Sequence, residues 1–166
     1  MPILTYLDHH PLIGAGVGLA DDAYIVGQVS VAGPALLAAG AVLRGDQNTI
    51  AVGPRFHIGR GSTIHVESYS PTRIGSDVWL GDSVVVHACT LGDGVRVEDG
   101  GLVLSTSRVG SGSIVTAGSL VPEGAEFPED SYIDGTPGRR VRATTSAERE
   151  ETRQRVGDAL VGAAER

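Results

Sequence analysis

The stretch LGDGVRVEDGGLVLSTSRVGSGSIVTAGSLV, residues 91–121, decides the fold because an aliphatic residue recurs in it at every sixth position. The recurring residues are Leu91, Val97, Val103, Val109, Val115 and Val121. A period of six matches neither the roughly 3.6-residue period of a helix nor the alternation of a half-buried strand. It is typical of a parallel β-helix whose coil has three flat faces of about six residues each.

The same period continues toward the N-terminus, with interruptions. Its earlier members are Val52, Ile58, Ile64, Ile74, Leu80 and Val86. The count is broken around VESYSPT (66–72), slips by one residue between Val86 and Leu91, and is less regular over residues 13–46. Gly, Asp and Asn fall between the aliphatics, where corners need positive φ. We therefore predict an all-β fold, a left-handed hexapeptide-repeat β-helix over residues 1–142, with the aliphatics pointing inward.

The texture of the sequence changes after residue 142. Thr145 and Glu148 have the spacing of a helix capping box. A narrow apolar stripe at helical spacing follows, made of Val156, Ala159, Leu160 and Ala163. We predict a C-terminal α-helix within residues 143–166 that packs on the β-helix or on a neighbouring subunit.

Composition limits the classes of partner. The net charge of −7 argues against a nucleic-acid-binding surface and against docking on anionic lipid. No apolar run is long enough to cross a membrane, and MPILTYLDHH (1–10) lacks the basic start and apolar run of a signal peptide. With the single cysteine Cys89, these features lead us to expect a cytoplasmic protein.

Four segments together resemble the γ-class carbonic anhydrases. They are AVLRGDQNTI (41–50), IHV (64–66), IGSDVWLGDSVVVHACTLG (74–92) and AGSLVPEG (117–124), in the family's order. The resemblance implies a homotrimer of left-handed β-helices, with a small-molecule substrate. It also implies a zinc ion at each subunit interface, held by three histidines, two from one subunit and one from its neighbour.

His65 and His87 match the two histidines that one subunit supplies. Their spacing supports this independently, because 22 residues equal one coil of about 18 plus the insertion at VESYSPT. The two imidazoles are then expected about 5 Å apart at the backbone, on one face. Asp82 takes the place of the third histidine. A carboxylate is an acceptable zinc ligand, but Asp is shorter than His and is also an ordinary corner residue, so we expect zinc to be weakly bound or absent.

Further site residues follow from the same resemblance. Arg44 and Asp46 match an ion pair at the family's subunit interface. The Gln-Asp pair that the family has near the metal falls here on Gly59 and Arg60. Arg60, Asp82 and the two histidines are expected to form an acid–base pocket, and Glu67 is a candidate proton shuttle.

Three other residues have structural expectations. We expect His57 at the surface, Cys89 as a buried thiol, and Trp79 either beside a substrate pocket or in the subunit interface.

Three classes of function remain open. In the first class, the chain is a genuine zinc-dependent carbonic anhydrase, in which a metal lowers the pKa of its bound water. Alternatively, it is a related lyase-type enzyme repurposed for hydration, elimination or cyclisation of a small organic molecule. The third class is a trimeric scaffold without chemistry, or an acyltransferase sharing the fold. The altered positions 59, 60 and 82 favour the repurposed enzyme.

Overall fold

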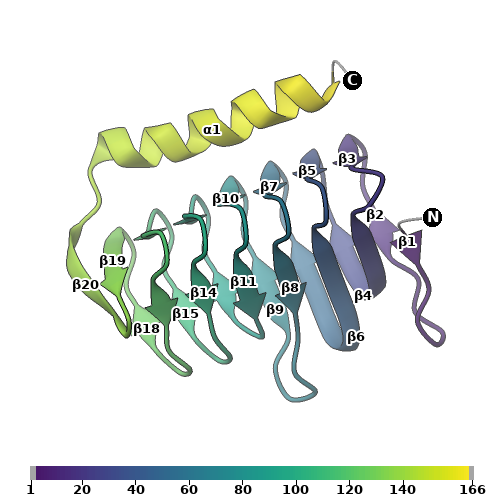
Figure 1. Cartoon of the computed structure of the whole chain (residues 1–166), viewed down its shortest axis with the longest axis horizontal. Coiled ribbons are helices and arrows are strands. Elements are labelled where there is room, and N and C mark those ends of the chain that lie inside the picture. Colours follow the sequence, from purple (N-terminus) through teal and green to yellow (C-terminus); the bar gives the residue numbers. More distant parts are fainter. Residues whose placement is uncertain (1–2, 165–166) are drawn as a thin grey trace.

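The computed structural model describes residues 3–164, which wind into a left-handed parallel β-helix with one α-helix laid along it (Figure 1). Strands one coil apart pair in parallel along three faces. The first face contains β1 (Ile3–Leu4), β4 (Tyr24–Val31), β6 (Val42–Val52), β8 (Thr63–His65), β11 (Val85–His87), β14 (Leu102–Val103) and β17 (Leu120–Val121). The second face contains β2 (Leu12–Ile13), the later parts of β4 and β6, β9 (Thr72–Ile74), β12 (Thr90–Leu91), β15 (Arg108–Val109) and β18 (Glu126–Phe127).

The third face forms a separate sheet. It contains β3 (Val17–Leu19), β5 (Ala35–Leu37), β7 (Phe56–Ile58), β10 (Val78–Leu80), β13 (Arg96–Val97), β16 (Ile114–Val115), β19 (Ser131–Gly135) and β20 (Gly138–Ala143). All its neighbours pair in parallel except the last two, because β20 turns back and runs antiparallel to β19. The first two faces are one sheet because β4 and β6 each continue around the corner between them.

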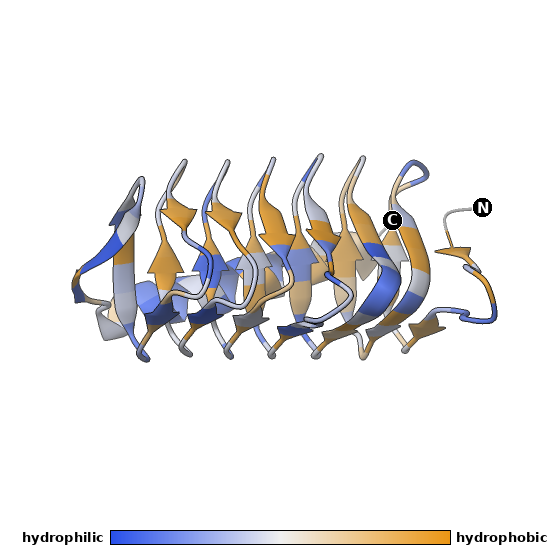
Figure 2. Ribbon diagram, turned by 90° about the horizontal axis from the view of Figure 1, so that it is seen from below, coloured by the Kyte–Doolittle hydropathy of each residue, from blue (hydrophilic) through white to orange (hydrophobic). Residues whose placement is uncertain are grey.

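The predicted register of the core is confirmed. All six aliphatic residues of the 91–121 stretch are at most 2% exposed. Parallel pairing places them in columns, so that Val103 lies between Val86 on the preceding coil and Val121 on the next. Figure 2 shows hydrophobic residues recurring on strand after strand along the solenoid. Each coil is stabilised by burying its aliphatic residues against the coils on either side.

The corners carry a repeated hydrogen bond between coils. Oδ1 of Asp82 accepts the backbone N–H of Arg60 at 2.8 Å. Asp93 accepts in the same way from Ser76, and Asp99 from Asp82, each at 2.8 Å. The residue before each capped N–H is a glycine, and at the first corner a Cβ on Gly59 would overlap the Asp82 carboxylate. At these three corners, an Asp side chain thus caps a backbone N–H of the preceding coil, next to a glycine.

The helix α1 (Ser146–Ala164) runs back along the third face toward the end where β1 lies (Figure 1). The predicted capping box is present, since Thr145 N–H donates to Glu148 and Glu148 N–H donates to Thr145 Oγ1. The helix contacts β5, β7 and β10 of its own chain and buries Val156 completely. Within residues 3–164, no helix has the length and apolarity needed to cross a membrane.

Charged residues also hold α1 to the β-helix. Arg96 on β13 forms ion pairs with Glu98 at 3.1 Å and with Glu151 of α1 at 3.4 Å. Arg155 of α1 pairs with Glu98 at 3.2 Å and with Glu151 at 2.7 Å. The apolar contact of this helix is narrow, so this network of four charges contributes to its position.

Candidate metal centre

His65 and His87 lie side by side at the end of the first face. Their Cα atoms are direct partners in the parallel pairing of β8 and β11, as the spacing predicts. Nδ1 of His65 is 3.2 Å from Nε2 of His87, and the two side chains are 15% and 24% exposed. The extra residues between them form a loop that leaves the coil and is closed by backbone hydrogen bonds between Glu67 and Ser70.

Asp46 holds the other nitrogen of His65. Its Oδ1 is 2.8 Å from Nε2 of His65, and its Oδ2 is 3.6 Å from Nε of Arg44. Burial acts to raise the pKa of Asp46. The hydrogen bonds from His65 and from its own backbone N–H, with the nearby charges of His65 and Arg44, outweigh burial, so the pKa is lowered overall. Asp46 therefore contacts a site histidine directly, in addition to pairing with Arg44.

Ser105 holds the other nitrogen of His87, a role that sequence reasoning missed. Its Oγ lies 3.0 Å from Nδ1 of His87, from a corner 18 residues further along the chain. The Glu67 carboxylate stands farther off, with Oε1 3.7 Å from the same nitrogen. The spacing of one coil between His87 and Ser105 was the available signal, but serine is common at the corners of this chain.

The histidine pair fits a zinc ion. Two zinc–nitrogen bonds of about 2.0–2.1 Å at a tetrahedral angle place the nitrogens about 3.3–3.4 Å apart, close to the 3.2 Å observed. Metal-binding histidines usually have their second nitrogen held by a carboxylate or another polar group. Asp46 and Ser105 occupy these outer positions. Within the described part of the chain, however, no third His, Cys, Asp or Glu completes a metal-binding group.

Asp82 and Arg60 lie together, but apart from the histidines of their own chain. Both are exposed, and both belong to the corner that precedes β8 and β11, whereas His65 and His87 end those strands. Asp82 lies in the turn before β11 and His87 is the last residue of that strand, and within the described residues Asp82 joins no metal-binding group of three ligands with the two histidines. In one chain Asp82 therefore cannot ligate the same metal as His87. Its Oδ1 accepts the Arg60 N–H of the preceding coil, as Asp93 accepts from Ser76 and Asp99 from Asp82.

His57 and Trp79 lie on the third face, away from the histidine pair. The expectation that His57 is at the surface is wrong, because the residue is only 8% exposed and stacks on Trp79 beneath α1. Burial lowers the pKa of His57, against the opposing effects of its hydrogen bond to the Leu80 carbonyl and of the Asp82 charge. Trp79 does not line the His65–His87 site of its own chain.

Cys89 is buried, as expected, and burial raises the pKa of its thiol to about 12.

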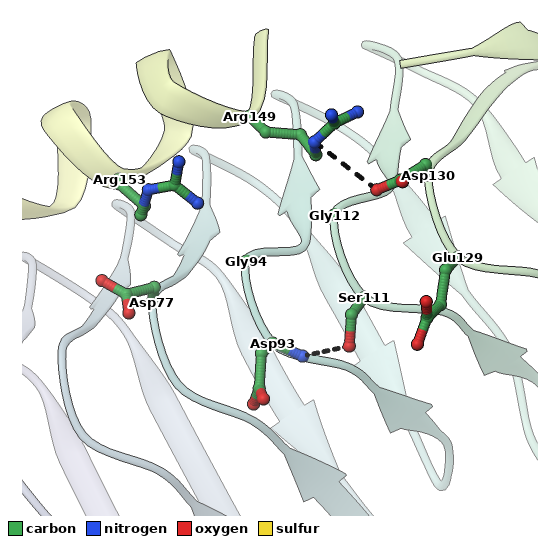
Figure 3. Close-up of a pocket in the computed structure, with 9 residues that line it drawn as sticks. All are labelled: Asp77, Asp93, Gly94, Ser111, Gly112, Glu129, Asp130, Arg149 and Arg153. Atoms are coloured by element: carbon green, nitrogen blue, oxygen red, sulfur yellow. Dashed lines mark hydrogen bonds and ion pairs between the residues drawn. The ribbon is translucent and has the colours of Figure 1, made fainter. Parts of the chain in front are cut away.

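A separate cavity of about 270 Å³ lies between α1 and the corners of the coils (Figure 3). Its lining includes Asp77, Asp93 and Asp130 opposite Arg149 and Arg153. Asp77 pairs with Arg55, Asp130 with Arg149 at 3.6 Å, and Arg153 with Glu150 of its own helix. The residues that line the cavity include no histidine, and among these three pairs Asp130–Arg149 is the one that joins α1 to a coil.

Comparison with known proteins gives the family. No family model matches the chain. A probable carbonic anhydrase of Methanocaldococcus jannaschii is 36% identical over 137 residues, covering 82% of this chain and 86% of that protein. The chain belongs to the γ-class carbonic anhydrase-like family. Within it, the mitochondrial gamma carbonic anhydrase 2 of Arabidopsis thaliana is 32% identical over 123 residues, and protein YrdA of Escherichia coli is 36% identical over 106. The matched segments cover 44% and 58% of those two proteins.

Solved structures extend the similarity of this γ-class carbonic anhydrase-like chain to its full fold. A hexapeptide transferase family protein from Anaplasma phagocytophilum has a TM-score of 0.93 and 28% identity, and covers 98% of this chain and 96% of its own. A putative acetyltransferase from Bacillus cereus has a TM-score of 0.94 and 25% identity, with 97% and 94% covered. The family therefore shares its fold with proteins named for a different chemistry, and function has to be inferred from the site.

Proposed function

We propose that this chain forms a cytoplasmic homotrimer whose sites combine His65 and His87 of one subunit with Asp82 and Arg60 of the next. We further propose that each site binds a metal ion such as zinc, with Asp82 as third ligand, and acts as a lyase-type enzyme on a small organic molecule. The reaction class is hydration, elimination or cyclisation. The observation that carries the proposal is the 3.2 Å distance between Nδ1 of His65 and Nε2 of His87. The other ring nitrogen of each histidine has a hydrogen-bond partner, Asp46 for His65 and Ser105 for His87.

The position of the two half-sites supports the trimer. Asp82 and His87 belong to the same coil and stand at opposite edges of the first face. Rotation about an axis parallel to the solenoid leaves the height of every coil unchanged. It can therefore bring one edge of a subunit against the opposite edge of the next at the same level. Cyclic symmetry of this kind closes into a ring, and each ring interface would then contain both half-sites.

Charge indicates the kind of substrate. Arg60 is exposed and its backbone is fixed by Asp82, so its guanidinium can hold an anionic group beside the site. Glu67 stands 3.7 Å from His87 on an exposed loop and can carry protons between the site and solvent. A bound metal would act as a Lewis acid and lower the pKa of a water molecule.

A second candidate is CO₂ hydration itself. It is favoured by the family and by the intact pair of outer contacts, Asp46 to His65 and Ser105 to His87. Against it, positions 59 and 82 both differ from the residues that the family resemblance implies. A side chain at position 59 would meet the Gly81 backbone first and the Asp82 carboxylate next, so this corner has no room for a Gln there.

Elemental analysis and light scattering of the purified protein, followed by CO₂ hydration assays on the parent and on Asp82→His, test these proposals. We expect a trimer with substoichiometric or weakly held zinc and slow CO₂ hydration, and tighter zinc in Asp82→His. A monomer at micromolar concentration would overturn the shared site. One tightly held zinc per subunit with fast CO₂ hydration in the parent would replace the repurposed enzyme by a carbonic anhydrase. Acetyl-CoA binding would support the acyltransferase class named by the structural relatives.

A further inference from the structure

A chain of hydrogen bonds runs through the site from a carboxylate to a hydroxyl. Asp46 Oδ1 is 2.8 Å from His65 Nε2, and His65 Nδ1 is 3.2 Å from His87 Nε2. His87 Nδ1 is in turn 3.0 Å from Ser105 Oγ. Each of the two imidazoles uses both ring nitrogens. The direction of donation along all three hydrogen bonds is therefore fixed once the hydrogen at either end is placed.

The carboxylate places that proton. An ionised Asp46 can only accept, so Nε2 of His65 carries the hydrogen. Nδ1 of a neutral His65 then has a free lone pair, and the hydrogen between the two rings belongs to Nε2 of His87. Nδ1 of a neutral His87 is left as an acceptor, so Ser105 donates its hydroxyl hydrogen to it.

Metal binding requires the opposite arrangement at His87. A metal bound between the two rings needs a lone pair on His65 Nδ1 and on His87 Nε2. The hydrogen of His87 must then be on Nδ1, where Ser105 Oγ has to accept it. A serine hydroxyl can either donate or accept, whereas an ionised carboxylate only accepts and alanine does neither.

We propose that Ser105 is a positioning residue that sets the tautomer of His87, as donor in the metal-free protein and as acceptor when a metal is bound. The inference rests on the proposed metal site for its second half only. The first half concerns the metal-free protein and stands on the three contacts alone. Ser105 thereby allows His87 to change between the two tautomers. In the metal-free protein His87 Nε2 donates to His65 Nδ1, and a metal has to displace this hydrogen bond.

The metal-free half is tested by ¹⁵N NMR of the histidine rings at pH 8 without added metal. We expect His87 protonated at Nε2 in the parent. In Ser105→Asp, whose carboxylate only accepts, we expect the hydrogen on Nδ1. A parent protein with His87 protonated at Nδ1 overturns the proposal, whether or not the protein binds zinc.

Zinc affinity, measured by chelator competition, tests the metal-bound half. Outer partners of metal-binding histidines typically change affinity about 10–100-fold. We expect Ser105→Ala to bind zinc at least tenfold more weakly, Ser105→Thr to match the parent, and Ser105→Asp to bind more tightly. Ser107→Ala is the matched control, because Ser107 is also buried at the same corner but donates to the Leu104 carbonyl.

Equal losses in Ser105→Ala and Ser107→Ala would show a general effect on the corner and overturn the role of Ser105. If the parent binds no zinc at all, the proposed metal function fails, but the NMR result still decides the tautomer. Circular dichroism of each variant separates a changed site from a changed fold.

Discussion

The imidazole of His57 stacks on the indole of Trp79, with ring centroids 3.8 Å apart and planes 11° from parallel. The stack lies on the outer side of the third face, where α1 covers it, and Arg155 of the helix stands 6.0 Å from the Trp79 ring centre. A titratable ring is therefore buried at the contact between helix and β-helix.

This stack should make stability fall as the pH drops through about 6.5. Burial lowers the pKa of His57 in the folded protein, so below the ordinary histidine pKa of about 6.5 the unfolded chain binds more protons. The loss grows until the lowered pKa is reached. His57→Phe keeps a stacked ring that cannot titrate, so its Tm should fall less between pH 7 and pH 5. An unchanged slope in His57→Phe would contradict the assignment.

Two substitutions of Asp82 separate its corner role from its proposed ligand role. Asp82→Asn keeps an oxygen that can accept from the Arg60 N–H, so its stability should match the parent. Asp82→Ala loses that hydrogen bond and should be less stable by about 1 kcal/mol. Both should bind zinc at least tenfold more weakly if Asp82 is a ligand. Parent-like zinc affinity in Asp82→Asn would leave Asp82 as a corner residue alone.

Val103→Asp should unfold the β-helix. The side chain is fully buried between Val86 and Val121, and an unpaired carboxylate there has no partner. Val141→Asp is the control, because the same change is made at a residue that is 58% exposed. Far-UV circular dichroism and melting should show loss of structure only in Val103→Asp; a parent-like Tm would mean that the inward register is wrong.

Deletion of residues 146–166 should leave the β-helix folded but less stable. The deletion uncovers the side of β10 on which the only tryptophan, Trp79, stacks with His57. We expect the β signal to persist, the Tm to fall and the Trp79 emission to shift to longer wavelength. Disappearance of the β signal would show that α1 is needed for the coils to form.

Cys89 should not react with thiol reagents in the folded protein. Burial raises the pKa of its thiol to about 12, and the thiolate is the reactive form. At pH 8 we expect no labelling without denaturant and full labelling in concentrated urea. Rapid labelling of the native protein would show that this corner opens.

The period of six predicted most of the fold, because a β-helix repeats one local rule on every coil. An inward aliphatic such as Val97 can be identified from its neighbours in the sequence alone. The same repetition placed His65 beside His87, since the spacing of one coil plus an insertion fixes their register. The position of α1 could not be predicted in this way. It brings residues near 156 over β7, and so His57 is buried by a segment about 100 residues later in the chain.

The outer contacts of the site were only partly predictable. Asp46 was singled out through the family resemblance, but its contact with His65 depends on how β6 bends around its corner. Ser105 carried no distinctive signal, because nothing in a run of Ser and Thr shows which hydroxyl faces a ring nitrogen on the preceding coil. Whether Asp82 meets the histidines depends on a second copy of the chain, which the sequence of one copy does not place.

The last strand, β20, has a sequence and pairing that should limit end-to-end aggregation of the solenoid. A parallel β-helix that simply stopped would present unpaired backbone groups at its last coil, where another chain could add as a further strand and begin a fibril. Here the third face ends in a strand of opposite direction, and the chain then leaves along α1. This last strand carries Arg139, Arg140 and Arg142 and pairs with β19 through a register shift, and such charges and irregularities discourage another chain from adding as a further strand.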